Sequence, residues 1–165
     1  MRPFLVPALM GLTGLALAAQ APALVLPQAS PRAQLSQKVG LTDITVTYAR
    51  PAVNGRKVWG GLVPYGQVWR AGANENTVFR VSHDVKVEGQ PLAAGSYGLF
   101  MVPGTEESTI IFSKNSTSWG HYFYTSKEDA LRVKVKPRKA PYTHWLTFDF
   151  VERKPEEATV VLRWD

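Results

Sequence analysis

One long stretch between two predicted strands holds the residues best suited to chemistry. From Tyr48 to Thr77 the sequence carries three arginines and a lysine against a single acid, Glu75. An arginine offers five donors in a flat fork, which suits carboxylates, phosphates and sugar hydroxyls. Tryptophan and tyrosine rings add flat apolar faces with a polar edge. Together these groups are typical of a pocket for a polar ligand with one apolar face, such as a sugar or small carboxylate. The candidate ligand-binding residues are Arg56, Trp59, Tyr65, Trp69, Arg70, Asn74 and Glu75.

A structural interpretation of the same residues is also open. Arginines in a long loop often bind the carbonyl oxygens of that loop, because buried backbone groups need partners. Trp59 and Trp69 could anchor the loop in the core, and Arg70 could form an ion pair with Glu75. We expect Asn54, Gly55 and Gly72 to supply turns with positive φ rather than function.

Patterns that define an enzyme or a metal site are absent from the sequence. The three histidines, His83, His121 and His144, are far apart, and there is no cysteine to complete a zinc site. No nucleophile elbow, phosphate-binding loop or dinucleotide fingerprint occurs. A hydrolase that uses Glu75 with an arginine-stabilised oxyanion is the remaining catalytic option. We therefore predict no metal and no cofactor, leave the catalytic residues unknown, and favour a protein that is not an enzyme.

The elements around this stretch are predicted to be strands. Apolar and polar residues alternate from Thr42 to Tyr48 and again from Thr77 to Ser82, as in half-buried strands. Structureless connections as long as the one between them are uncommon and are usually functional or disordered. Its aromatic content argues against disorder, so we expect an ordered loop. Strands are predicted over 33–38, 42–48, 77–82, 85–87, 97–102, 108–114, 119–124, 131–135, 145–151 and 158–164.

This pattern predicts an all-β fold, a mostly antiparallel β-sandwich of about nine or ten short strands. One helical turn near Ser126 is the only helix expected. The lysines of 131–135 and its surroundings suit an edge strand that avoids pairing with other chains.

The first residues have the three parts of a secretory signal peptide. Arg2 is followed by an apolar run and by small residues, with a cleavage site expected before Ala19. The apolar run is short for a membrane anchor. We therefore predict a signal peptide over 1–18, a flexible mature N-terminus over 19–32 and a single β-sandwich domain over 33–165. Export without cysteines favours a bacterial periplasm or exterior.

The positive charge of the chain is modest and dispersed. The formal net charge is +6, and lysine and arginine are not gathered in one run. A nucleic-acid-binding protein is expected to show a basic stripe or a known motif. We predict no nucleic-acid partner and no membrane span after cleavage of the signal peptide, while the oligomeric state stays open.

Four segments are distinctive, namely the string from Gly55 to Thr77, the element from Gly89 to Tyr97, Trp119-Gly120 and the stretch from Asp129 to Arg132. They resemble a family of exported bacterial proteins catalogued as domain-of-unknown-function family 2911. The resemblance covers roughly Ser30 to Trp164. It implies export and a single β domain, and it implies no activity and no catalytic residues. Many members continue past the position of Trp164.

Two main functional hypotheses follow. The first is a secreted or periplasmic binding module with a polar small-molecule or glycan site at the loop from Arg56 to Glu75. The second is a structural or protein-interaction domain of the cell envelope, with partners on a sheet edge or on the apolar surface near 119–124. The hydrolase that uses Glu75 is a third, less favoured option.

Overall fold

The computed structural model describes residues 26–165, and this part of the chain is all β. The predicted signal peptide and residues 19–25 of the predicted flexible segment lie outside the described residues. One 3-10 turn, η1, spans Ser126–Glu128, as the sequence predicts. The strands are β1 (Arg32–Val39), β2 (Thr42–Ala49), β3 (Val78–Val81), β4 (Val85–Val87), β5 (Gln90–Leu92), β6 (Gly95–Val102), β7 (Ser108–Ser113), β8 (Asp129–Val135), β9 (Thr147–Val151) and β10 (Thr159–Arg163).

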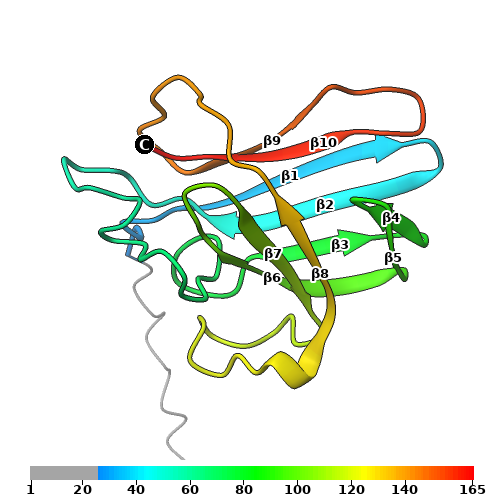
Figure 1. The fold of residues 1–165 in the computed structure, drawn as a ribbon, viewed down its shortest axis with the longest axis horizontal. Helices are drawn as coiled ribbons and strands as arrows, with labels where there is room; N and C mark the ends of the chain where they lie inside the picture. Colours follow the sequence, from blue (N-terminus) through cyan, green and yellow to red (C-terminus); the bar gives the residue numbers. More distant parts are fainter. Residues whose placement is uncertain (1–25) are drawn as a thin grey trace, which may run out of the picture.

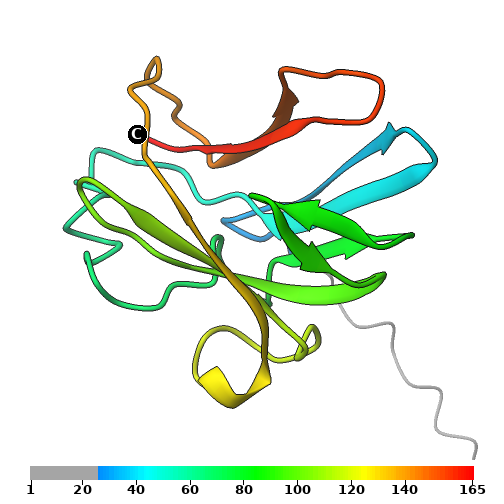
Figure 2. The same cartoon turned by 45° about the vertical axis from the view of Figure 1, so that its right-hand side comes forward.

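Six of these strands form one antiparallel sheet in the order β1-β2-β3-β6-β7-β8. The direction of the strands turns along this sheet, so that β8 crosses the line of β1 steeply (Figure 1). The β9–β10 hairpin lies over the β1–β2 side as a second layer (Figure 2). The small β4–β5 hairpin lies at the far end of the sheet from the long loop (Figure 1). The predicted antiparallel, sandwich-like fold is confirmed.

The core lies between the large sheet and the β9–β10 hairpin. Alternate residues of each strand enter it, including Val46 and Tyr48 of β2 and Phe148 of β9. The Tyr48 ring packs edge-on against Phe148 at 4.8 Å, and its hydroxyl accepts a hydrogen bond from the Phe148 amide. This period-two burial is the one predicted from sequence. Residues 97–100 are buried in succession, so this part of β6 is covered on both faces.

The long loop between β2 and β3 is ordered because its start pairs with the segment before β9 and its later part pairs with β6. At its start, the Val53 amide donates to the His144 carbonyl, and the Leu146 amide donates to the Pro51 carbonyl. Near its end, Trp69 exchanges two backbone hydrogen bonds of 2.8 Å with Met101 of β6. Val58, Val63 and Ala71 of the loop belong to the hydrophobic core. The loop is therefore part of the domain framework.

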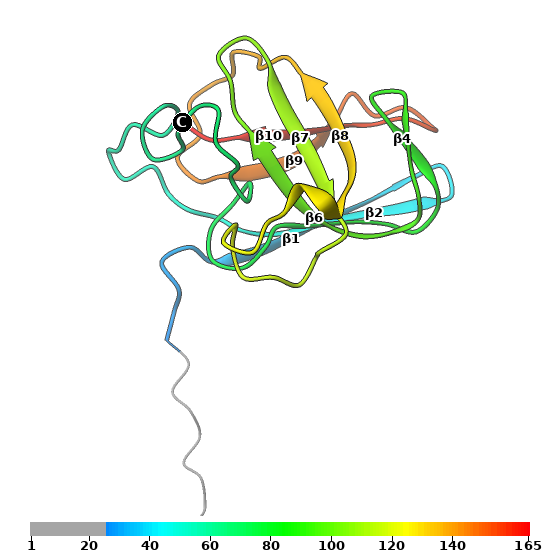
Figure 3. The same ribbon diagram turned by 60° about the horizontal axis from the view of Figure 1, so that its bottom comes forward.

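The predicted strand over 119–124 is wrong. These residues form a turn-rich segment between β7 and η1, beside the end of the long loop (Figures 1 and 3). Gly120 has a φ of +68°, which turns the chain, and no neighbouring strand pairs with the segment among the described residues. Aromatic residues favour strands only where a half-buried sheet surface receives them, and here most of the rings face solvent.

Within residues 26–165, we find no helix with the length and apolar character needed to cross a bilayer.

Candidate functional site

A cleft of about 300 Å³ lies where the long loop meets the segment before β1, the residue after β10 and the turn-rich segment over 119–124, which we call the aromatic segment. Its lining includes both candidate arginines, Arg56 and Arg70, together with Trp69. The other side of the cleft comes from residues remote in sequence, namely Ser30, His121 and Trp164. The tertiary fold thus assembles this site from four separate parts of the chain.

Three tryptophans pack together beside this cleft. The rings of Trp69 and Trp164 stack at 5.9 Å with an angle of 16°. Trp59 packs edge-on against both, at 5.8 Å from Trp69 and 6.5 Å from Trp164. The Trp59 indole N–H donates to the Trp164 carbonyl at 2.7 Å, and that of Trp69 donates to the Gly72 carbonyl at 3.1 Å. These contacts hold the rings in fixed orientations and give the cleft a rigid aromatic wall.

The two candidate arginines have different partners. Arg56 Nε donates to the Val53 carbonyl at 3.0 Å, and its Nη2 donates to the Ala52 carbonyl at 2.6 Å. Those bonds satisfy the backbone of the loop, as the structural interpretation predicted. The guanidinium of Arg56 therefore helps to close the loop, although the residue also borders the cleft.

Arg70 has a different environment. Its side chain is half-buried, its Nε is inaccessible to solvent, and within residues 26–165 that atom has no hydrogen-bond acceptor. No ion pair joins it to Glu75 or to another acid in this part of the chain. Burial lowers the pKa of the Arg70 guanidinium, and the nearby Tyr122 phenol opposes that shift. An arginine stays protonated in proteins, so a poorly hydrated positive charge borders the cleft.

Trp164 adds a second donor without a partner. Its ring is almost fully buried, and its indole N–H finds no acceptor among the described residues. Buried polar groups are usually hydrogen-bonded, so an unpaired one requires an explanation. Two such donors therefore belong to residues that line one cleft.

The remaining candidate residues lie outside the cleft lining. Tyr65 is largely exposed and packs against Gly60, where an added Cβ would come within 2.7 Å of the ring. Asn74 donates through its side-chain amide to the Gln28 side chain at 3.3 Å and to the Ser30 carbonyl at 3.2 Å. It therefore secures the segment that precedes β1. Glu75 is exposed and points to no partner in residues 26–165.

The expectation for Gly72 is wrong, whereas Asn54 and Gly55 do have positive φ. Gly72 is buried, and a Cβ there would come within 2.6 Å of Thr77 Oγ1 and 3.3 Å of the Ala49 carbonyl oxygen. The position lacks space for a side chain and has no need of a left-handed backbone.

Sequence reasoning did not find Pro51, His121 or Trp164 as neighbours of Arg70. The alternation through 158–164 marks Trp164 as a core residue, which it also is. Nothing local connects it to a loop that lies 105 positions away at Trp59. His121 lies in the segment 119–124, for which the sequence predicts a strand, and that prediction gives no reason to place His121 at the long loop.

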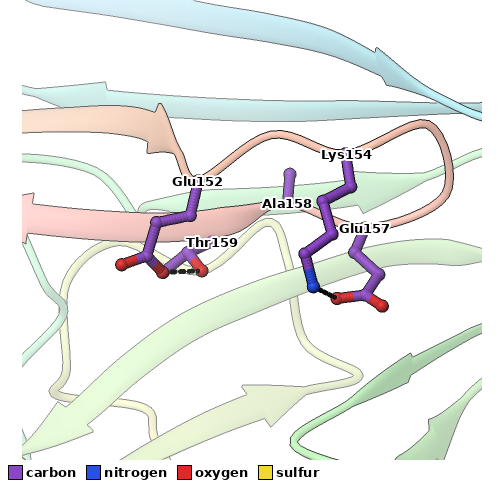
Figure 4. A pocket seen from close by; sticks show the side chains of 5 residues that line it. All are labelled: Glu152, Lys154, Glu157, Ala158 and Thr159. Atoms are coloured by element: carbon purple, nitrogen blue, oxygen red, sulfur yellow. Dashed lines mark hydrogen bonds and ion pairs between the residues drawn. The ribbon is translucent and has the colours of Figure 1, made fainter.

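A second surface pocket lies in the turn between β9 and β10 (Figure 4). Its charged groups are already paired. Glu152 accepts from Arg138 at 3.2 Å and from the Thr159 hydroxyl at 2.8 Å, and Lys154 pairs with Glu157 at 2.9 Å. These bonds lower the pKa of Glu152, with the Thr159 hydroxyl as the largest cause. The pocket is best explained as an ion-paired turn.

Metal-binding side chains do not cluster in the described chain: across residues 26–165, no three His, Cys, Asp or Glu residues lie close enough to hold an ion.

Fold and site together define an all-β domain that carries an arginine beside a tryptophan-walled cleft. The sequence profile of a family described as "Protein of unknown function (DUF2911)" matches residues 30–165, so the chain belongs to this family. The match includes every residue that lines the cleft. No protein with a curated description and no solved structure matches the chain.

Proposed function

We propose that this protein is an exported bacterial binding module whose cleft holds the anionic group of a small polar ligand at Arg70. The observation that supports this proposal is the state of Arg70, a half-buried cation that lines the cleft and whose buried Nε has no acceptor in residues 26–165. The signal-like composition of the first residues supports export to the periplasm or the exterior.

The energetics of Arg70 favour a ligand over a role in the fold. Removing a charge fully from water without pairing it costs several kcal/mol, and the half-buried Arg70 bears only part of that cost. Arg50 and Arg56 of the same loop bind backbone carbonyls, whereas Arg70 does not in the described chain. A carboxylate, phosphate or sulfate group would accept charge-assisted hydrogen bonds from the N–H groups of the Arg70 guanidinium.

The walls of the cleft suit a ligand with both a charge and a flat apolar face. Trp69 and Trp164 provide rigid aromatic surface, and Gln67 and His121 add polar groups at the lining. This mixture of a few polar groups on apolar walls is typical of small-molecule sites. A small carboxylate or an acidic sugar fits this cleft. The sequence likewise suggests a sugar or a small carboxylate.

The test is ligand binding to Arg70→Met, with Lys57→Met as a matched control. Lys57 is an exposed cation of the same loop that lies outside the cleft lining, so both variants lose one charge. We expect calorimetry with dicarboxylates, uronic acids and phosphate esters to show binding to wild type and Lys57→Met, and at least about a tenfold loss, or 1.4 kcal/mol, for Arg70→Met. Equal binding by all three proteins, or by none, would overturn the proposal.

A structural or protein-interaction domain of the envelope is the second candidate function. The exposed aromatic residues of 119–123 favour it. It predicts that an envelope protein is captured equally by wild type and by Arg70→Met. The hydrolase option has less support, because its acid, Glu75, is absent from the cleft lining.

A further inference from the structure

Three aromatic side chains form a stack at the edge of the cleft. The rings of Trp119 and Tyr122 are nearly parallel, with an angle of 7° and centroids 6.1 Å apart. His121 stacks on Tyr122 at 4.9 Å with an angle of 19°. We call Trp119, His121 and Tyr122 the aromatic stack. Trp119 is 56% exposed and Tyr122 is 72% exposed, so most of this surface faces solvent.

The aromatic stack is continuous with the cleft. His121 belongs to both, since it lines the cleft beside Arg70. Tyr122 lies close enough to Arg70 for its phenol to influence the guanidinium. Figure 3 shows the segment that carries the stack next to the end of the long loop. A ligand held at Arg70 therefore has aromatic surface beside it.

The fold fixes the position of this segment. The Asn76 amide donates to the Ser118 carbonyl at 3.4 Å, and its side chain donates to the Asn115 carbonyl at 3.3 Å. Asn76 directly precedes the buried Thr77 at the end of the long loop. The same stretch of chain thus positions Arg70 and anchors the segment of the stack.

The composition of the segment indicates which kind of ligand it suits. From Asn115 to Thr125 there is no lysine, arginine or acid, while serine, threonine and asparagine are frequent. A membrane-binding surface combines aromatic residues with lysines and arginines. Sugars present a C–H face that packs on aromatic rings and hydroxyls that bind neutral polar groups. Trp, Tyr and His rings offer such faces with polar edges.

We propose that the cleft and the aromatic stack together bind an acidic oligosaccharide, with its carboxylate or sulfate at Arg70 and an adjoining sugar ring on Trp119 and Tyr122. This inference rests on the proposed function of Arg70 and names the ligand class of that site. The excess of positive charge, formally +6 for the full chain and 6 − 1 = +5 without Arg2 of the predicted signal peptide, favours the approach of an acidic polymer.

The experiment compares galacturonic acid with its dimer and tetramer, and with neutral galactose oligomers of the same lengths, by calorimetry at fixed salt. The stack is removed by the double substitution Trp119→Ala and Tyr122→Ala. Phe123→Ala is the matched control, because Phe123 is 68% exposed in the same segment but belongs to no ring pair found in the described chain.

We expect wild type and Phe123→Ala to bind the acidic tetramer at least about tenfold more tightly than the monomer. The double variant should bind the monomer with the affinity of wild type, and its affinity should not increase from monomer to tetramer. Neutral oligomers should bind much more weakly. Circular dichroism of the double variant checks that the domain remains folded.

Different failures have different meanings. If wild type binds monomer and tetramer equally, or the double variant keeps the gain with length, the oligosaccharide inference is overturned and the Arg70 site stands. Binding of non-sugar anions alone at Arg70 would also overturn the oligosaccharide inference and leave the Arg70 site standing. So would a result in which the protein needs the aromatic stack to bind phosphatidylglycerol vesicles but not to bind sugars. If Arg70→Met leaves every anion bound as before, the proposed function itself fails, and this inference fails with it.

Discussion

At the scale of single residues, three arginines of the long loop have three different environments. Arg50 donates to the Leu146 carbonyl at 3.0 Å and to the Thr147 hydroxyl at 2.7 Å, so it joins the loop to β9. Arg56 binds carbonyls within its own turn. Arg70 borders the cleft without an acceptor in the described chain. Only the tertiary surroundings separate a framework arginine from a candidate ligand-binding one.

This difference predicts opposite effects on stability. Arg50→Met should lower the free energy of unfolding by about 2 kcal/mol, because it removes hydrogen bonds from a charged donor and leaves the Leu146 carbonyl unpaired. Arg70→Met should leave stability unchanged within about 0.5 kcal/mol or raise it, because it removes a partly desolvated charge whose Nε has no acceptor in residues 26–165. Urea unfolding of both variants measures this. A loss of several kcal/mol for Arg70→Met would contradict the assignment of Arg70 as unpaired.

The Tyr124 hydroxyl should lose its proton at an unusually high pH. Burial raises the pKa of Tyr124, and the hydrogen bond to Asp129 at 3.0 Å and the charge of Asp129 add to the rise, while Arg132 opposes it. The folded state thus favours the neutral phenol more than the unfolded state does. Its contribution to stability is complete below the ordinary tyrosine pKa of about 10 and is lost as pH rises from there through the higher folded value.

Tyrosinate absorbance measures this directly. The difference between the titrations of wild type and Tyr124→Phe should show a transition above the ordinary range. Asp129→Asn should move that transition to lower pH, because it removes the carboxylate that favours the neutral phenol. A difference curve centred at or below the ordinary tyrosine range would show that the described environment of Tyr124 is wrong.

At the scale of elements, strands with period-two patterns were predictable and the aromatic segment was not. The alternation through β2 or β9 reflects one buried and one exposed face, which is a local property of the sequence. The residues of 119–124 have strand-like composition without a sheet neighbour to receive them. Gly120, with its positive φ, is the local feature that should have favoured a turn.

The close approach of β6 to the aromatic segment predicts the effect of a single methyl group. A Cβ on Gly98 would lie 2.4 Å from the Asn115 carbonyl oxygen and 3.0 Å from the Phe100 ring. Gly98→Ala should therefore cost about 1–3 kcal/mol of unfolding free energy, because the backbone of the segment must move. It should also disturb the bond from Asn76 to Asn115.

Gly95→Ala is the control on the same strand. The three atoms nearest to its Cβ would all belong to the Tyr97 side chain, at 3.3 Å or more, so we expect a change near zero in guanidinium unfolding. Equal effects of the two substitutions would show that the segment does not rest on β6 as described.

At the scale of the whole molecule, the cleft depends on contacts between distant parts of the chain. The two residues after β10 meet the long loop: Trp164 packs against Trp59 and Trp69, and the Val58 amide donates to the Asp165 carboxylate at 3.3 Å. Sequence could place Arg56, Trp69 and Arg70 together because they share one loop. It could not place Trp164 or His121 beside them, because that requires the order and twist of the strands.

Trp164→Ala therefore tests the connection between core and site. Removing this buried ring should cost about 3–5 kcal/mol of unfolding free energy and open the wall behind Trp69. Trp145→Ala, which removes a partly exposed tryptophan of the neighbouring segment, should cost much less. Chemical unfolding measures both, and anion binding by the folded fraction of Trp164→Ala should weaken. Similar costs for the two variants would contradict the packing of Trp164 in the core.

The hydrogen bond from the Trp59 indole to the Trp164 carbonyl also determines when the cleft can form during synthesis and folding. It joins residues 105 positions apart, and contacts of such sequence separation form slowly, because a large part of the chain must be ordered first. A chain emerging from the ribosome can pair β1 with β2 early, yet it cannot complete the tryptophan wall until residue 164 is available. The cleft is therefore among the last features to mature, and a chain still being made or carried unfolded has no assembled site with which to capture a ligand.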